Sequence, residues 1–239
     1  MRMIFTLTTI LVISGTTLAQ YGELTGLKIL KPEDTEHVKS TPAPAGAKVL
    51  FDGKSLEAWG VKGKPDTAAS WKIVDGAMEC AKGDIVTKEL FGGSFKLHVE
   101  FRVPYVPKGV GQGRGNSGVY VQGRYEVQVL DSYGLESKTN DCGAIYEVAK
   151  PLVNACKAPT IWQSYDIEFH APKFEGTKKV EPARMTVHHN GVKIHDNVKI
   201  ESNNTRAGMG GDPSKPGPIM LQDHGHPVQY RNIWLLPIQ

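Results

Sequence analysis

The 239-residue chain is poor in cysteine, in aromatic residues and in long hydrophobic runs. Its three cysteines, Cys80, Cys142 and Cys156, are too few and too irregularly spaced for a structural zinc site. After residue 13 no apolar stretch approaches the about 20 residues that a membrane helix needs, so we expect no membrane span. The formal net charge is +3, but lysine and arginine form no dense cluster, which argues against a nucleic-acid partner.

The sequence also lacks helical patterning, since no window of twelve residues carries a convincing amphipathic stripe. Glycine (26 residues) and proline (15 residues) are abundant, which favours many turns. Charged residues make up 22% and hydrophobic residues 40%, as in an ordinary soluble globular protein. The length suits one β domain, because such domains run to about 200–250 residues.

The first 19 residues predict a cleaved signal peptide. Arg2 gives a positive start, residues 4–13 are apolar, and small residues lead to a cut after Ala19. The alternative, a membrane anchor, is disfavoured because this apolar run is shorter than the about 20 residues that span a bilayer. We therefore expect a secreted or periplasmic protein. Residues 20–46 are expected to form an extended, partly disordered linker, and residues 47–239 a single domain.

Export would place the cysteines where disulfides form. Cys142 and Cys156 lie in one loop-rich segment, and we expect them to pair and leave Cys80 as a buried free thiol. Such a bridge would stabilise the fold by roughly 3 kcal/mol on the chain-entropy model. Three reduced, buried cysteines are the alternative.

Residues 47–239 are patterned for strands. Polar and apolar residues alternate in 95–103, 165–171, 184–189 and 192–195, as in strands with one buried face. Asn190-Gly191 between the last two runs is a strong hairpin signal. Further strands are expected at 47–51, 71–75, 84–87, 117–122, 124–130, 218–222 and 228–236. So many short strands predict an all-β fold, a two-sheet antiparallel sandwich or jelly roll.

The segment 114–133 carries the densest chemistry. The strand at 124–130 places Arg124, Glu126 and Gln128 on one face, and a bulge at 129–130 would return Asp131 to that face. Two carboxyl groups separated by an amide suit general acid/base catalysis. A solvated strand face with ordinary charges is the alternative.

A second cluster, Gln222, Asp223 and His224, lies at the end of an expected strand, where catalytic groups are often held. His224 and His226 are weak candidates for metal ligands. Trp162 offers a flat platform for a sugar ring, although it also suits the core. His188, His189 and His195 are expected to be surface residues of a hairpin.

Several segments, taken together and in order, resemble the 3-keto-disaccharide hydrolase domain family over about residues 47–239. They are Leu50–Leu56 with Trp59, Trp71–Gly76, Asn116–Tyr120 with Gln122–Ser132, Trp162–Asp166, Pro182–Arg184, Asn190–Val192 with His195–Asn197, Gly217–Ile219, Leu221–Gly225 and Arg231–Trp234. The resemblance implies a concanavalin A-like sandwich, similar to laminarinase-type glycanases, that binds carbohydrate. Asn116 and Tyr120 then join the expected sugar-binding residues, together with Arg124, Gln128, Trp162, Gln222 and Asp223.

The resemblance also implies a reaction. The ketone of a 3-keto-glycoside acidifies the proton on C2, so that a base can remove it, the C1 substituent can leave, and water can add to the enone. Glu126 is the expected base, Arg124 and Gln128 the oxyanion or hydroxyl partners, and His224 or Asp131 the acid. No cofactor is implied, although the use of a divalent cation is not excluded by the sequence.

Two alternatives stay open beside the hydrolase: a carbohydrate-binding module without turnover and a conventional β-glycanase. Laminarinase-type enzymes carry two glutamates in the strand that corresponds to Glu126–Asp131. Here the last acid is an aspartate and the middle residue is the amide Gln128. This departure counts against a double-displacement mechanism, which needs carboxyl groups about 5–5.5 Å apart.

Overall fold

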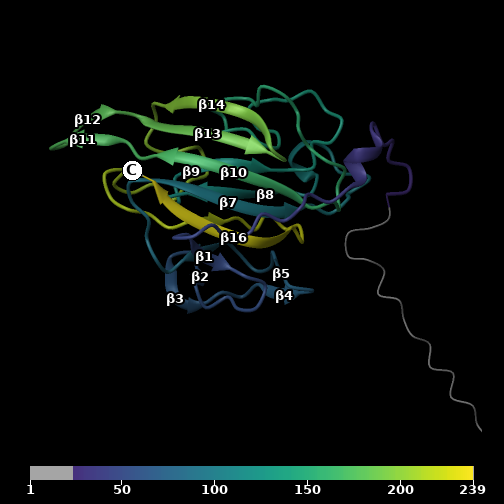
Figure 1. The fold of residues 1–239 in the computed structure, drawn as a ribbon, viewed down its shortest axis with the longest axis horizontal. Coiled ribbons are helices and arrows are strands. Elements are labelled where there is room, and N and C mark those ends of the chain that lie inside the picture. Colours follow the sequence, from purple (N-terminus) through teal and green to yellow (C-terminus); the bar gives the residue numbers. More distant parts are fainter. Residues whose placement is uncertain (1–23, 239) are drawn as a thin grey trace, which may run out of the picture.

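A computed structural model of the chain describes residues 24–238, which fold into two antiparallel β-sheets and a two-stranded ribbon (Figure 1). The expected signal peptide, residues 1–19, and the first residues of the expected linker lie outside the described residues. Within 24–238, no helix has the length and apolar character that a bilayer crossing requires.

The larger sheet has eight strands in the order β14-β13-β10-β7-β16-β5-β4, with β1 also paired to β16. Their bounds are β1 Lys48–Phe51, β4 Lys72–Val74, β5 Ala77–Glu79, β7 Ser94–Arg102, β10 Gln163–His170, β13 Ala183–His189, β14 Val192–Ile200 and β16 Gln229–Ile238. Asn190 and Gly191 between β13 and β14 have φ of 53° and 79°, so the expected Asn-Gly hairpin is confirmed.

The smaller sheet has six strands in the order β3-β2-β6-β15-β8-β9. Their bounds are β2 Trp59–Val61, β3 Lys64–Ala68, β6 Ile85–Thr87, β8 Ser117–Val121, β9 Tyr125–Val129 and β15 Met220–Leu221. The ribbon β11 Lys173–Glu175 and β12 Lys178–Glu181 projects at one end of the molecule (Figure 1), and two 3₁₀ turns cover Pro32–Thr35 and Gly111–Gly113. The all-β antiparallel sandwich is confirmed.

The core lies between the two sheets. Phe95, Leu97, Val99 and Phe101 of β7 are all at most 1% exposed and belong to one cluster with inward residues of β8 and β9. Alternation along the sequence predicted this inward set because successive side chains of a strand point to opposite faces. The polar residues of the other set face away from the core, where His98 and Glu100 are nevertheless buried.

Residues 30–41 of the expected linker are docked on the domain rather than loose. The Leu30 N–H donates to the Tyr133 hydroxyl, which in turn donates to Asp34. Ser40 donates to Glu100, and the indole of Trp234 donates to the carbonyl of Thr41. This docking helps to bury Glu100 on the outer face of β7, whereas His98 is covered by the stacked ring of Trp234 at 5.0 Å.

The histidines expected at the surface of the β13–β14 hairpin are corrected in part. His188 is half-buried, but His189 and His195 are each 1% exposed. His189 shares the inward set of β13 with Val187, and the ring of His195 contacts the carbonyl of Gly143 at 2.7 Å. Burial lowers the pKa of His189 to about 3, so its ring is neutral.

The expected disulfide is also corrected. Cys80, Cys142 and Cys156 are all free and buried. The sequence spacing had correctly placed Cys142 and Cys156 near each other, since their sulfur atoms lie in one cluster with the ring of His189.

Candidate functional site

One row of side chains crosses the outer face of the six-stranded sheet, the face turned away from the core. Neighbouring strands pair Gly60 with Val86, Val86 with Met220, Met220 with Tyr120, and Tyr120 with Glu126. Val86, Met220 and Tyr120 form a small apolar cluster separate from the main core. The row therefore ends on β9 with a carboxyl group beside a phenol.

Glu126 has an unusual environment for a carboxyl group. It is 2% exposed, and its Oε2 is buried with no hydrogen-bond partner among the described residues. Its backbone is held on both sides, because its N–H donates to Thr205 and its carbonyl accepts from the N–H of Tyr146. The scaffold thus fixes the residue while leaving one carboxyl oxygen without a partner.

The pKa of Glu126 is raised from 4.5 to about 7. Burial is the largest cause, because it penalises the ionised form. The negative charges of Asp84 and Glu147 raise it further, while a hydrogen bond from Tyr120 opposes the shift. A carboxyl group with this pKa exchanges a proton readily near neutral pH, as a general base must.

Tyr120 is a hydrogen-bond partner of this carboxyl. The Gln222 side-chain amide donates to its hydroxyl at 2.9 Å. Burial, followed by the charge of Glu126, raises the pKa of the Tyr120 phenol, so it stays protonated. A side chain at Gly118, the next outward position of β8, would lie 2.5 Å from Glu126 Oε1. Glycine is required there because Glu126 and Tyr120 fill the space above it.

Gln128 begins a second polar group on the same face. Its side-chain amide donates to Gln112 at 2.8 Å, and the Asn116 amide donates to the carbonyl of Gln112 at 2.9 Å. The backbone N–H of Asn116 donates to His226 Nδ1 at 3.3 Å, while Asn116 Oδ1 is buried without a partner among the described residues. Two of the expected sugar-binding residues, Asn116 and Gln128, are therefore joined through Gln112.

The Gln222–His224 turn lies beside this face. Asp223 accepts from the N–H of Gly83 at 2.8 Å, and its own N–H donates to Asp84 at 2.9 Å. His224 is exposed. In residues 24–238, no group of three side chains suited to a metal includes His224 or His226.

Asp131 and Arg124, which the sequence placed with Glu126, have other partners. Asp131 forms an ion pair with Arg114 at 3.1 Å and accepts from the N–H of Tyr133. The guanidinium of Arg124 donates to the carbonyls of Asp212 at 2.7 Å and Lys215 at 3.1 Å. In this structure Asp131 therefore secures a turn and Arg124 secures a loop.

Trp162 lies elsewhere, next to the larger sheet. Its ring is contacted by the guanidinium groups of Arg102 at 4.8 Å and Arg231 at 4.2 Å. Trp162 is 6% exposed. These cation–π contacts and the burial of the side chain leave its ring little surface for a sugar.

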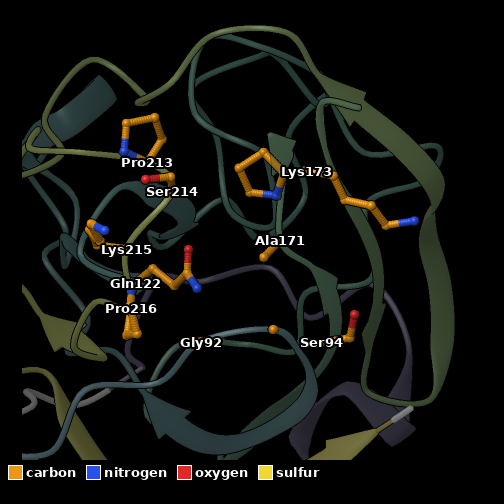
Figure 2. Close-up of a pocket in the computed structure, with 11 residues that line it drawn as sticks. Gly92, Ser94, Gln122, Ala171, Lys173, Pro213, Ser214, Lys215 and Pro216 are labelled. Atoms are coloured by element: carbon orange, nitrogen blue, oxygen red, sulfur yellow. The ribbon is translucent and has the colours of Figure 1, made fainter. Parts of the chain in front are cut away.

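Two surface hollows are relevant here, and neither is lined by Glu126. A hollow of about 330 Å³ has Gln122, Lys215 and Ser94 among its lining residues, and Figure 2 shows the side chain of Gln122 close to Lys215 and Pro216. A wider hollow of about 680 Å³ is lined by Glu136–Asn140, Glu147 and Lys150. The carbonyl of Asn140 in this second hollow accepts from the amides of Gln112 and Gln128, which connects it to the polar face.

Sequence reasoning missed Gln112, Asp84 and Tyr146. Gln112 lies in a glycine-rich turn with no strand pattern, and its role depends on long-range contacts with Gln128 and Asn116. Asp84 had one available signal, its position at the start of an expected strand. The segment of Tyr146 pairs with the edge of β9 through a bridge between Val127 and Ile145, which no local pattern predicts.

Comparison with known proteins now identifies the family. A family profile described as the 3-keto-alpha-glucoside-1,2-lyase-like domain matches residues 46–236. The chain belongs to this family. The match starts within one residue of the expected domain start at 47 and confirms the family recognised from the motifs.

Solved structures agree. A candidate glycosyl hydrolase from Parabacteroides distasonis is 36% identical, with a TM-score of 0.71 and coverage of 87% of this chain and 97% of that chain. A second candidate glycosyl hydrolase from that organism is 20% identical, with a TM-score of 0.59 and coverage of 81% and 94%, and shows the fold alone. No curated protein matches the chain. The family and the first structure support a carbohydrate-active enzyme.

Proposed function

We propose that this protein cleaves 3-keto-glycosides, with Glu126 as the base that removes the proton from C2. The enolate then expels the oxygen substituent from C1, and water adds to the resulting enone. The observation that carries the proposal is the buried carboxyl of Glu126, whose pKa is about 7 and whose Oε2 has no hydrogen-bond partner among the described residues. A base of this kind is matched to proton abstraction near neutral pH.

Tyr120 takes the part of the enolate stabiliser in this scheme. In the free protein its hydroxyl donates to Glu126 and accepts from Gln222; when substrate is bound, it would give up the bond to Glu126 and donate to the ketone oxygen. A neutral donor in a buried site stabilises developing negative charge on the ketone oxygen strongly, because little water competes for it. His224, exposed two residues after Gln222, is the candidate that returns a proton to the leaving oxygen. Asp131 is not retained for this role.

The proposal requires that sugar binding uncovers Glu126, which is 2% exposed. We infer that the segment that pairs with the outer edge of β9 is the one that moves: the N–H of Gly143 donates to the carbonyl of Gln128, and that of Tyr146 to the carbonyl of Glu126. The wide hollow lined by Asn140 and Glu147 lies on this same segment. Entry from that side would bring a sugar to both polar groups of the face.

The test compares Glu126→Gln with wild type on a 3-keto-glucoside, with product release followed by NMR. We expect a loss of about 10²–10⁴-fold in kcat, the usual contribution of a positioned base. The matched control is Glu168→Gln, a half-buried outward glutamate of the other sheet, which should retain full activity. Wild-type turnover by Glu126→Gln would refute the role of Glu126.

A carbohydrate-binding module without turnover is the second candidate, and the closure of Glu126 in this structure favours it. Calorimetry with unoxidised oligosaccharides tests it: micromolar binding by wild type, with no product from any 3-keto-glycoside, would establish binding alone. A conventional β-glycanase is disfavoured, because Arg114 holds the second carboxyl, Asp131.

A further inference from the structure

Three side chains from distant parts of the chain meet beneath the loop that covers the edge of β9. They are Cys142 in that loop, Cys156 in the segment before β10, and His189 at the end of β13. A sulfur or ring-nitrogen atom of each lies within 4.8 Å of the others. All three residues are buried, with exposures of 3%, 9% and 1%. Nothing in the proposed reaction uses them.

The hydrogen bonds around His189 fix which ring nitrogen carries the proton. His189 Nε2 lies 3.0 Å from Gln163 Oε1. That atom is the amide oxygen, because it also accepts from the backbone N–H of Lys157 and from the side-chain amide of Asn190. An amide oxygen only accepts, so His189 Nε2 must donate, and Nδ1 carries the free lone pair.

The ring of His189 is also held in place. It stacks on Phe101 with centroids 5.9 Å apart and meets Tyr165 edge-on at 4.8 Å. A histidine that donates one N–H to an oxygen acceptor while its other nitrogen is free is the usual arrangement of a metal ligand, because the acceptor sets both tautomer and orientation. Gln163 is such an acceptor here.

We propose that Cys142, Cys156 and His189 form a site for Zn²⁺. Two thiols and one imidazole are donors that zinc prefers. Binding replaces two thiol protons by one dication, so two thiolates, a neutral imidazole and Zn²⁺ carry no net charge, as a buried site requires. Water would complete the fourth position, as is usual when zinc has three protein ligands.

The site would act as a structural cross-link. Cys142 lies in the loop that pairs with β9, whereas His189 belongs to the larger sheet. Tyr165 connects the cluster to the polar face, because its hydroxyl lies 3.1 Å from Cys142 Sγ and donates to the carbonyl of Gln128 at 2.7 Å. Bound zinc would therefore anchor the loop whose position determines access to Glu126.

Metal content tests the proposal without reference to activity. The full-length protein is refolded with reducing agent and zinc, passed through a desalting column, and assayed for zinc and for thiols after denaturation. We expect about one zinc per chain in wild type and in Cys80→Ser, which removes a cysteine outside the cluster. Cys156→Ser and His189→Gln should lose the metal while keeping the β-sheet circular dichroism of wild type.

Cobalt keeps the test decisive if those variants fail to fold. Co²⁺ bound by wild type should give a sulfur-to-cobalt charge-transfer band in the near ultraviolet, and Zn²⁺ should abolish it. Folded wild-type protein that has three titratable thiols, no zinc and no such band would overturn the proposal. A Cys142–Cys156 disulfide that persists under these reducing conditions would overturn it equally.

Discussion

Two buried glutamates, Glu100 and Glu126, lie on the outward faces of opposite sheets, and their pKa values are shifted in opposite directions. Glu100 on β7 accepts from Arg231 at 2.6 Å, Ser40 at 2.5 Å and Asn232 at 2.7 Å. Burial raises its pKa, but these bonds and that of His98 outweigh it, and the pKa falls to about 2. Glu126 has no such donors on Oε2, and its pKa rises to about 7.

The comparison teaches that partners, rather than burial, decide what a buried carboxyl does. At Glu100 the donors come from the docked N-terminal segment and from β16, so the charge is compensated and holds the chain together. At Glu126 one oxygen lacks a donor, so the charge is costly and the proton is exchangeable. Perturbation of the second kind marks functional sites more often than structural ones.

Removing the partner of Glu100 should have the largest effect on stability. In Arg231→Met the carboxyl stays buried without its cation, and breaking a buried pair costs about 3 kcal/mol. Urea unfolding at neutral pH measures the change in the free energy of unfolding. The double variant Arg231→Met with Glu100→Gln should recover part of the loss, since it removes the stranded charge. Equal stability of wild type and Arg231→Met would show that Arg231 does not compensate the buried charge of Glu100.

The pH dependence of that stability has a definite sign. The pKa of Glu100 is lower in the folded protein, so its contribution is complete above the unfolded value near 4.5 and disappears as the pH falls toward 2. Glu100→Gln should therefore flatten the loss of stability over this range. Unfolding midpoints of the two proteins between pH 5 and about 2 provide the measurement.

Glu126→Gln should change the free energy of unfolding in the opposite direction and by a somewhat smaller amount. Because the folded pKa of Glu126 is raised, wild type loses stability as the pH rises from 4.5 to about 7. A neutral amide avoids this cost, so the variant should be more stable than wild type above pH 7, by at most about 3 kcal/mol, since one pKa unit equals 1.36 kcal/mol. Below pH 4.5 the two should be nearly equal. A variant that is less stable at high pH would show that Glu126 is ionised and well paired.

Tyr120→Phe should lower the activity, because it removes a polar partner of Glu126. The variant keeps the ring in the apolar cluster with Val86 and Met220 but removes the hydroxyl beside Glu126. Loss of one donor to a developing oxyanion lowers kcat, by about 10²-fold for a well-placed donor. KM should change little, whereas the unfolding midpoint should fall, because Gln222 and Glu126 lose the hydrogen bonds of this hydroxyl. An unchanged kcat would remove Tyr120 from the mechanism.

Glu168→Gln should have the smallest effect. Glu168 faces solvent in part and pairs with Lys96 at 3.5 Å and His170 at 3.1 Å. Such exposed pairs contribute about 0–1 kcal/mol. Both the activity and the free energy of unfolding should stay close to those of wild type. A large change in either would contradict the small contribution expected of an exposed ion pair.

Local alternation predicted the strands and the face of each side chain well. Phe95 and its alternate neighbours are inward, and Glu126 and Gln128 share an outward face, as expected. Alternation did not predict which outward faces would be covered. Val192 was expected to be buried but is 45% exposed, whereas His195 is buried against the loop at Gly143.

The candidate site was predictable only in part, because some of its contacts depend on the order of strands that are distant in the sequence. Glu126 and Tyr120 meet through the local β8–β9 pairing, whereas Gln222 joins them because β15 lies between β6 and β8, an order that no local signal contains. Asp131 and Arg124 lie in the same stretch of sequence as Glu126. The side chain of Asp131 pairs with Arg114, however, and that of Arg124 donates to carbonyls of the 212–215 loop. Proximity in sequence therefore suggested a carboxyl pair that the chain does not form.

The titration of Glu126 and Glu100 in one sample tests the central claim most directly. Carbon-13 NMR of side-chain carboxyl groups, assigned with Glu126→Gln and Glu100→Gln, follows both residues in the same spectra. We expect Glu126 to titrate at about pH 7 and Glu100 to stay ionised down to about pH 2. Titration of Glu126 at or below its ordinary value of 4.5 would contradict it.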